Sequence, residues 1–275
     1  MDTPLVALDV QNRDGVAEVT LLGPGKGNAL GPDFWAELPG LFARLDADES
    51  VRAVLITGSG DNFSYGLDLT AYATLWGSLL AEEGGLARPR TRLHEQIRGL
   101  QVALDAVAEC RKPVVAAISG WCIGGGVDLI AACDVRYASA DAKFSVREVR
   151  VAMVADLGSL QRLPGIISDG HLRELALSGK DIDAARAASI GLVNDVLETP
   201  AEALAAAREF AVQVAGNPPL VVQGIKQVLD VERSGRVAAG LKLVAAWNSA
   251  FLPSADLAEA MAAFAERREP GFTGR

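Results

Sequence analysis

Three acidic residues follow a run of glycines near the middle of the chain, and together they suggest proton-transfer chemistry. The run Gly124-Gly125-Gly126 comes after the apolar stretch 113–118 and before the apolar, helix-like stretch 129–133. A strand that enters a glycine turn and opens a helix leaves backbone N–H groups free to meet a negative oxygen. The acids that follow this turn are Asp128, Glu148 and Asp156. An anion-binding turn beside carboxyl groups predicts a reaction in which an enolate forms and protons move.

Each acid also has a structural interpretation that the sequence leaves open. Glu148 could form a surface ion pair with a neighbouring arginine, Arg147 or Arg150. Asp156 could cap the N-terminus of a following helix, and Asp128 could be an acid that favours the first turn of its helix. The residues around Glu148 and Asp156 are largely apolar. Burial among them would raise a carboxyl pKa and permit acid–base work near neutral pH.

The elements that must position these residues follow an alternating pattern in the first half of the chain. Strands are expected at 16–21, 51–58, 113–118, 135–138 and 143–146, and helices at 33–45 and around 93–107. Strands that alternate with helices predict an α/β fold with right-handed crossovers and a largely parallel sheet. The mixed segment 76–92 is expected to be a flexible connection over the site. Beyond about residue 160 helices are expected at 201–214, 218–232, 237–251 and 255–268.

Composition excludes several classes of protein. The 275 residues are 50% hydrophobic, which allows a sizeable core, and no run of about 18 apolar residues suggests a membrane span. A formal charge of −9 disfavours sequence-independent binding to nucleic acid. Three cysteines and two histidines without ligand spacing predict no metal site. Reduced thiols, and an N-terminus without a secretory signal, predict a cytoplasmic protein.

Several motifs, taken together, resemble the crotonase (enoyl-CoA hydratase/isomerase) superfamily. The motifs are Phe63-Ser64-Tyr65-Gly66-Leu67-Asp68-Leu69, Ile123-Gly124-Gly125-Gly126-Val127-Asp128, Ala132-Cys133-Asp134-Val135-Arg136-Tyr137 and Phe144-Ser145-Val146-Arg147-Glu148. The resemblance runs from about residue 16 to 268. It implies a ββα-superhelix spiral core over residues 1–200, which holds the coenzyme A (CoA) and active sites. It also implies a C-terminal helical region over residues 201–275, used for assembly into homotrimers or homohexamers.

The resemblance assigns roles to the residues of both glycine motifs. Leu67 and Gly125 would supply the two N–H groups of an oxyanion hole. Residues expected to bind the acyl-CoA substrate are Lys26, Ser64, Tyr65, Gly66, Asp68 and Gly124. A solvated loop lysine remains an alternative for Lys26, and Asp68 is expected to order the loop after the oxyanion hole. No metal or redox cofactor is expected, since CoA is part of the substrate.

The acids narrow the resemblance to the Δ3,5-Δ2,4-dienoyl-CoA isomerase branch. The segments 147–149, 155–164 and 246–248 are similar to that branch. Enoyl-CoA hydratases typically carry Glu at the position of Asp128 and a small or apolar residue near that of Asp156. The resemblance therefore implies conversion of 3,5-dienoyl-CoA to 2,4-dienoyl-CoA, with Glu148 and Asp156 moving protons at opposite ends of the diene in either order. A 2-enoyl-CoA hydratase and a non-catalytic acyl-CoA-binding or scaffolding protein remain the alternatives.

Overall fold

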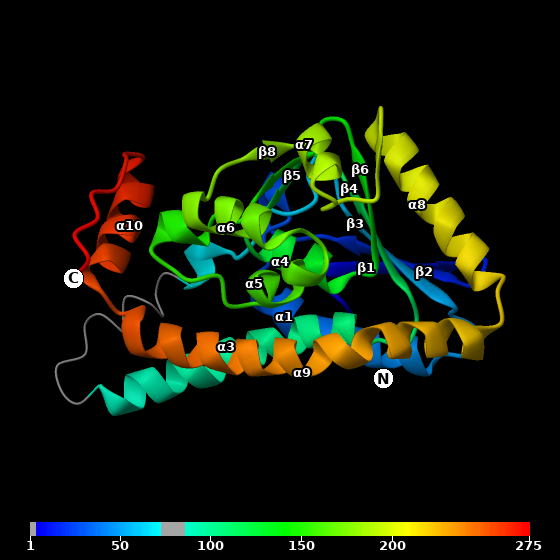
Figure 1. Cartoon of the computed structure of the whole chain (residues 1–275), viewed down its shortest axis with the longest axis horizontal. Coiled ribbons are helices and arrows are strands. Elements are labelled where there is room, and N and C mark those ends of the chain that lie inside the picture. The colour runs from blue at the N-terminus through cyan, green and yellow to red at the C-terminus, as the bar shows by residue number, and fades with distance from the viewer. Residues whose placement is uncertain (1–3, 73–85) are drawn as a thin grey trace.

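A mostly parallel sheet forms the core of the protein in a computed structural model (Figure 1). The structure describes residues 4–72 and 86–275, except for the side chain of Lys26. The sheet has the order β1-β2-β3-β4-β6-β9, and only β1 and β2 pair antiparallel. Its strands are β1 (Leu8–Arg13), β2 (Val16–Leu21), β3 (Ala53–Gly58), β4 (Val114–Ile118), β6 (Val135–Ser139) and β9 (Asp195–Leu197). The predicted α/β class and parallel sheet are confirmed. The pattern missed β1, because this edge strand is mostly exposed and lacks a run of apolar residues.

Alternate residues of the central strands pack against different layers of helix. Leu55 and Val115 contact Ala207 and Ala211 of helix α8 (Pro200–Ala215) in one apolar cluster. Their neighbours in the strands join the larger cluster on the other face, beneath α1 (Pro32–Ala47) and α3 (Ala87–Ala108). Both faces of β3 and β4 are therefore covered, which explains why these strands are continuously apolar in sequence.

A small second sheet carries the chain into the glycine turn. It has the order β5-β7-β8, formed by β5 (Trp121–Ile123), β7 (Lys143–Ser145) and β8 (Ile182–Asp183). Strand β5 leads through Gly124 into helix α4 (Gly125–Ala132). The helix after the glycines was predicted, but the strand expected to enter the turn, 113–118, is β4 of the main sheet, and β5 was not predicted. The remaining short helices are η1 (Gly25–Gly27), η2 (Glu148–Val151), α5 (Ser159–Arg162), η3 (Leu163–Gly165), α6 (Asp169–Ser178) and α7 (Ala184–Ser189).

The C-terminal region differs from the sequence prediction in one respect. Helix α9 (Pro219–Phe251) is a single helix of 33 residues, where two helices were predicted. Gly235 lies at the predicted break, yet a glycine inside a helix costs only about 1 kcal/mol relative to alanine. Packing of α9 against α3 and α5 runs along the helix and outweighs that cost (Figure 1). Helix α10 (Ala255–Glu266) then contacts η2.

The predicted connection over residues 76–92 is only partly described. Residues 73–85 lie outside the described part of the chain. Ala87–Arg92 already belong to α3, so this end of the prediction was wrong. Pro89 fits there because the first turn of a helix does not need its N–H. No helix within the described ranges is long and apolar enough to cross a membrane.

Candidate active site

Two backbone amides from distant loops converge beside the glycine turn. A Cβ placed on Gly125 would lie 3.4 Å from the Leu67 nitrogen, and one placed on Gly66 would lie 2.9 Å from the Gly125 nitrogen. Bonds from the Leu30 amide to the Gly66 carbonyl and from the Asp68 amide to the Leu30 carbonyl, 2.7 and 3.2 Å long, hold the first loop. Neither the Leu67 nor the Gly125 N–H donates to a protein acceptor among the described residues. Both amides are therefore placed to receive one ligand oxygen.

Helix α4 orients the Gly125 amide. Gly124 has φ +50°, a conformation that side chains rarely adopt, and its carbonyl accepts from the Val127 and Asp128 amides. At the other end of α4, the buried Arg136 guanidinium donates to the carbonyls of Ile130 and Cys133. The positive end of the helix dipole therefore points at the proposed oxyanion position, while the negative end is met by a cation.

Glu148 lies directly beside this turn. Its Oε1 would be 3.4 Å from a Cβ on Gly124, and its buried Oε2 has no hydrogen-bond partner in the described structure. Arg147 bonds instead to Asp181 at 2.5 Å, and Glu148 has no ion pair among the described residues, so the surface ion-pair interpretation was wrong. Burial, followed by the neighbouring charge of Asp128, raises the pKa of Glu148 well above its usual value. Burial therefore favours the neutral form of this carboxyl.

Asp128 is fully buried and touches two parts of the site. Its Oδ1 accepts from the Ser159 amide at 2.5 Å, so it caps the short helix α5. Its carboxyl also hydrogen-bonds that of Glu148, and burial raises the pKa of Asp128 to about 6. Two carboxyls in such contact favour a shared proton, because both cannot ionise cheaply.

Asp156 is held by the C-terminal helix. Asn248 Nδ2 donates to Asp156 Oδ2 at 2.7 Å, and burial raises the pKa of Asp156 to about 7. The helix-cap alternative was wrong for this residue. Helix α5 begins three positions later at Ser159, and the acid that accepts from its first turn is Asp128. The structure thus brings Glu148, Asp128 and Asp156 into one electrostatically coupled group.

Two of the predicted substrate-binding residues shape the loop around Leu67. The buried Ser64 hydroxyl donates to the Asn28 carbonyl at 2.8 Å and accepts from the Gly66 amide at 3.0 Å. Asp68 Oδ1 accepts from the Thr70 and Ala71 amides, each at 3.1 Å. Both side chains therefore order backbone in the present structure.

Of the other two loop residues, Tyr65 lies where a ligand could approach. It is exposed, and its ring lies so close to Gly27 that a Cβ there would overlap it. The backbone of Lys26 lies in η1 next to Gly27, while its side chain is outside the described residues. The loop that carries Leu67 thus also presents Tyr65 to solvent.

Sequence reasoning missed two amide side chains that fix Asp156. Gln101 is fully buried, and its Nε2 donates to the Asp156 carbonyl at 2.6 Å and the Leu241 carbonyl at 3.2 Å. Asn248 appeared only as part of a motif, without a role. A signal was present, because Gln101 stands at helical spacing between Ile97 and Leu104 on a core-facing stripe. A polar residue at such a position needs a buried partner.

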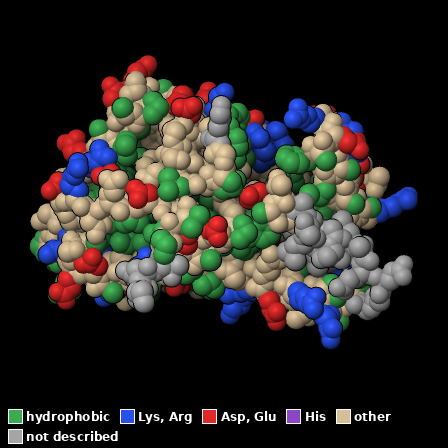
Figure 2. Space-filling model, turned by 180° about the vertical axis from the view of Figure 1, so that it is seen from behind, with side chains coloured by type: hydrophobic (Ala, Val, Ile, Leu, Met, Phe, Trp, Pro, Cys, Tyr) green, Lys and Arg blue, Asp and Glu red, His purple; other side chains and the backbone are tan. Residues whose placement is uncertain are grey.

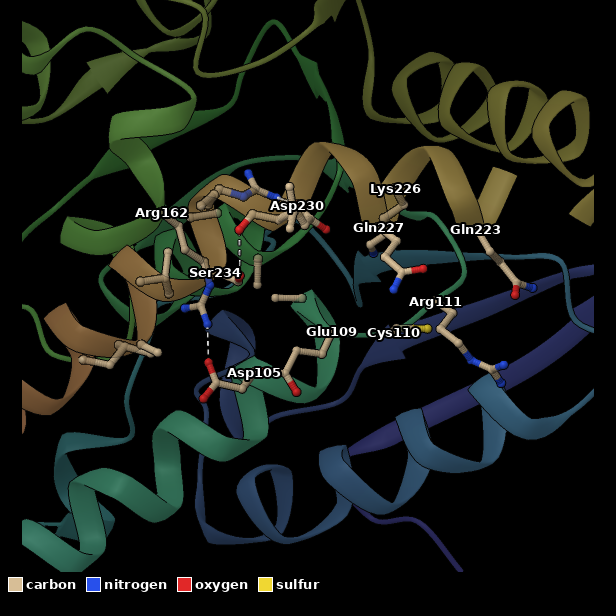
Figure 3. A pocket seen from close by; sticks show the side chains of 18 of the residues that line it. Asp105, Glu109, Cys110, Arg111, Arg162, Gln223, Lys226, Gln227, Asp230 and Ser234 are labelled. Carbon is tan, nitrogen blue, oxygen red and sulfur yellow. Dashed lines mark hydrogen bonds and ion pairs between the residues drawn. The ribbon is translucent and has the colours of Figure 1, made fainter. Parts of the chain in front are cut away.

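A large cavity in the described structure lies away from the acids. It measures about 710 Å³ between α3, α4 and α9 and does not border Glu148 or Asp156 (Figure 3). Several of its charged side chains are engaged in ion pairs, including Arg162 with Asp105 at 2.5 Å. Chemistry, rather than cavity size, therefore locates the candidate active site. Within the described ranges, no group of His, Cys, Asp and Glu has the arrangement of a metal site.

Known proteins are similar to this chain over most of its length. A Δ3,5-Δ2,4-dienoyl-CoA isomerase from Arabidopsis thaliana, named as peroxisomal, is 42% identical and covers 90% of this chain and 89% of its own length. A mitochondrial enzyme of the same name from Dictyostelium discoideum is 40% identical, with coverages of 98% and 92%. A more distant relative, the (E)-benzylidenesuccinyl-CoA hydratase of Thauera aromatica, is 33% identical, with coverages of 98% and 99%.

These relatives overturn the predicted cytoplasmic location. The two isomerases are named as peroxisomal and mitochondrial. The prediction rested on unpaired cysteines, and all three are free and buried in the structure. Free thiols argue against an oxidising compartment, but they do not distinguish the cytosol from the interior of an organelle.

A solved structure and a family model cover nearly the whole chain. The crystal structure of an enoyl-CoA hydratase/isomerase from Pseudoalteromonas atlantica superimposes with a TM-score of 0.83 at 30% identity, and covers 98% of this chain and 100% of its own. The model of the enoyl-CoA hydratase/isomerase family matches residues 11–275. With its convergent amides and buried acids in place, the chain belongs to the enoyl-CoA hydratase/isomerase family.

Proposed function

We propose that the protein isomerises 3,5-dienoyl-CoA to 2,4-dienoyl-CoA. The observation that carries this proposal is Asp156, a third acid with a pKa near 7 in the same group as Glu148 and Asp128. Relatives named as Δ3,5-Δ2,4-dienoyl-CoA isomerases at about 40% identity support it. The reaction removes one proton at C2 and adds one at C6, and therefore needs acid–base groups at two separated carbons.

The position of Glu148 suggests the order of the proton transfers. Glu148 lies beside Gly124, next to the amides of Gly125 and Leu67 proposed to bind the thioester oxygen. C2 is adjacent to the thioester carbon, so Glu148 takes the C2 proton, and the electrons of that C–H bond move into the thioester to give a conjugated enolate that the oxyanion amides stabilise. When the thioester carbonyl re-forms, the C1=C2 pair of the enolate becomes C2=C3 and the C3=C4 pair becomes C4=C5. The C5=C6 pair then takes a proton from the neutral carboxyl of Asp156 and forms the new C–H bond at C6.

Hydration of a 2-enoyl-CoA is the second candidate function. It requires two carboxyls that hold one water between them, and Glu148 and Asp128 are the pair for that role. Their carboxyls instead hydrogen-bond one another, and hydration assigns no task to Asp156. Binding of acyl-CoA without turnover is the third possibility, and the three acids with raised pKa values argue against it.

The test supplies purified enzyme with 3,5-dienoyl-CoA and, separately, with 2-enoyl-CoA of the same chain length. We expect rapid formation of 2,4-dienoyl-CoA, followed by its ultraviolet absorbance and by mass spectrometry. Faster formation of 3-hydroxyacyl-CoA would establish the hydratase instead. Acyl-CoA binding without turnover of either substrate, across chain lengths, would identify a binding protein.

The proposed chemistry requires no metal or redox cofactor, because the thioester supplies the acidity and the oxyanion hole stabilises the enolate. Lys26, Ser64, Tyr65, Gly66 and Asp68 belong to the two loops proposed to hold CoA. Dialysis against EDTA is expected to leave turnover of 3,5-dienoyl-CoA unchanged. A loss of activity that Mg²⁺ or Zn²⁺ restored would show that a metal takes part.

Self-association through α9 completes the proposal. Large apolar side chains on this helix are more than half exposed, namely Leu220, Val221, Ile225, Val228, Leu229, Val231, Leu243, Trp247 and Phe251. Val221, Ile225 and Val228 repeat at helical spacing, opposite the buried stripe that contains Leu241. Exposed apolar surface on this scale is typical of an interface. We assign its occupant as a second copy of the chain, in a homotrimer or homohexamer.

A further inference from the structure

Asn248 makes two hydrogen bonds that determine how Asp156 is presented to a substrate. Its Nδ2 donates to the Val154 carbonyl at 2.8 Å and to Asp156 Oδ2 at 2.7 Å. A backbone carbonyl can only accept, so the bond to Val154 fixes which end of the Asn248 amide carries the nitrogen. The second N–H is thereby aimed at Oδ2. Asn248 itself is almost completely buried, so water does not compete for these bonds.

The segment that carries Asp156 has no regular structure of its own. It lies between η2 and α5, which end and begin at Val151 and Ser159. Gln101 of α3 holds the Asp156 carbonyl, and Asn248 of α9 holds its carboxyl. No side chain other than Asn248 donates to the Asp156 carboxyl among the described residues. Oδ1 is therefore the oxygen left to face a substrate.

We propose that Asn248 is a positioning residue for the isomerisation, which engages Oδ2 of Asp156 and reserves Oδ1 for the proton exchanged at the far end of the diene. This inference rests on the proposed function and adds a residue of the C-terminal helix to it. The bond stabilises the carboxylate form in a site where burial favours the neutral acid. Asn248 thus lets Asp156 both release and regain a proton near neutral pH.

The groups around Asp156 make this effect measurable. The charged groups near it are Asp128 of α4 and Glu148 of η2, both acidic, with Arg162 of α5 beside Asp128. From α3, Gln101 contacts the main chain and is itself bonded by Arg98. Asn248 is thus the one neutral donor to the carboxyl among the described side chains. Without it, a backbone hydrogen bond is left to oppose the burial and the neighbouring acids that raise the pKa of Asp156.

The test measures the pH dependence of kcat in three variants. Asp156→Asn identifies the limb of the wild-type profile that belongs to Asp156. Asn248→Leu, close in size but without a donor, should move that limb upward by about one pH unit, the shift expected from losing a bond to a charged group. Asn248→Asp places a like charge beside Asp156 and should move it further. This graded response separates an electrostatic role from a purely structural one.

A matched control comes from the same helix. Ser249 is also buried, and its hydroxyl bonds only the Ala245 carbonyl within α9. In Ser249→Ala the Asp156 limb of the kcat profile should lie at the same pH as in the wild type. If the Asp156 limb of the kcat profile lies at the same pH in Asn248→Leu as in the wild type, the proposal is overturned, whatever the size of kcat in the variant.

A second readout does not depend on turnover. The pKa of Asp156 can be followed by carbon NMR in protein labelled at the Asp carboxyl, with the signal identified by its absence in Asp156→Asn. The pKa of Asp156 should rise in Asn248→Leu and stay unchanged in Ser249→Ala. An unchanged Asp156 signal in Asn248→Leu would again reject the inference. Failure of the wild-type enzyme to convert 3,5-dienoyl-CoA would instead reject the proposed function.

Discussion

At the scale of single residues, the proposed site depends on three carboxyl groups whose uncharged form is favoured by burial. Desolvation is the largest cause of the raised pKa values of Glu148, Asp128 and Asp156, and repulsion from neighbouring acids adds to it for Glu148 and Asp156. A carboxyl with a pKa near the working pH can both give and take a proton, and the pKa values of about 6 and about 7 place Asp128 and Asp156 in that range.

Replacing Asp156 with asparagine should abolish proton transfer by this residue, while the side chain keeps nearly the same size and shape. We expect Asp156→Asn to reduce kcat for 3,5-dienoyl-CoA by about 100-fold or more, the usual value of a general acid or base. Affinity for CoA thioesters should change little, since Asp156 is not among the residues proposed to hold CoA. Steady-state kinetics and calorimetric binding of a saturated acyl-CoA measure the two effects. Full isomerase activity in the variant would remove Asp156 from the mechanism.

The same acids should make stability depend on pH. Their pKa values are raised by folding, so the folded state binds these protons more tightly than the unfolded state does. Their contribution is fully present below about pH 4 and is lost as pH rises through 6 and 7. Between pH 5 and pH 8, the free energy of unfolding of Asp156→Asn should fall by on the order of 2 kcal/mol less than that of the wild type. Urea titrations of both proteins at the two pH values measure this difference. If the free energies of unfolding of the two proteins changed with pH in parallel, the raised pKa of Asp156 would be contradicted.

At the scale of elements, a glycine turn and a neighbouring loop form the proposed oxyanion hole. Gly66 has φ +79°, and a Cβ there would lie 2.6 Å from the Ile123 carbonyl. The close approach of these two segments brings the Leu67 and Gly125 amides together. Each glycine motif alone is compatible with an ordinary tight turn, and only their contact makes an anion site.

Gly66→Ala should separate the two amides. We expect kcat to fall by about 100-fold, comparable to removal of one oxyanion donor, because the added methyl pushes the loops apart. Gly60→Ala is the matched control, since Gly60 also has a positive φ of +67° but has open space around it. The control should lose some stability and retain its kcat. Equal losses of kcat in the two variants would argue against this geometry.

At the scale of the whole molecule, α9 joins the catalytic site to the proposed interface. One side of this helix buries Leu241 and Asn248, while the other exposes a stripe that includes Val228 and Leu229. Figure 2, which shows the face turned away in Figure 1, has hydrophobic side chains interspersed with charged ones. The proposed interface and the proposed positioning residue thus lie on opposite sides of one helix.

A charge within the stripe should disrupt assembly. Leu229→Glu is expected to shift the protein toward the monomer, because burying a carboxylate in an apolar interface costs several kcal/mol. Leu177→Glu on α6 is the control, since Leu177 is exposed to a similar degree, 75% against 73%. Analytical ultracentrifugation measures both. A wild-type protein that sediments as a monomer would refute the proposed assembly.

Much of the fold followed from local patterns. Strands β2, β3, β4 and β6, helix α1 and the helix after the glycine turn appear where apolar periodicity and turn residues predicted them, because both faces of the central strands are buried. The short parallel strands β5 and β9 were not predicted. Edge strand β1 was missed and α9 was divided in two. In both cases tertiary contacts outweighed the local signal, through pairing with β2 and through packing against α3 and α5.

The sequence by itself determined the chemistry available to this protein, namely two glycine motifs and three acids of suitable type. Only the tertiary structure decided which groups meet. Gln101 lies 55 positions from Asp156 and Asn248 lies 92 positions from it, yet both hold that residue in place. Nothing local encodes such contacts, because they arise when α3 and α9 pack together around a segment without regular structure. The same packing turns an isolated carboxylate into a buried acid with a pKa near 7.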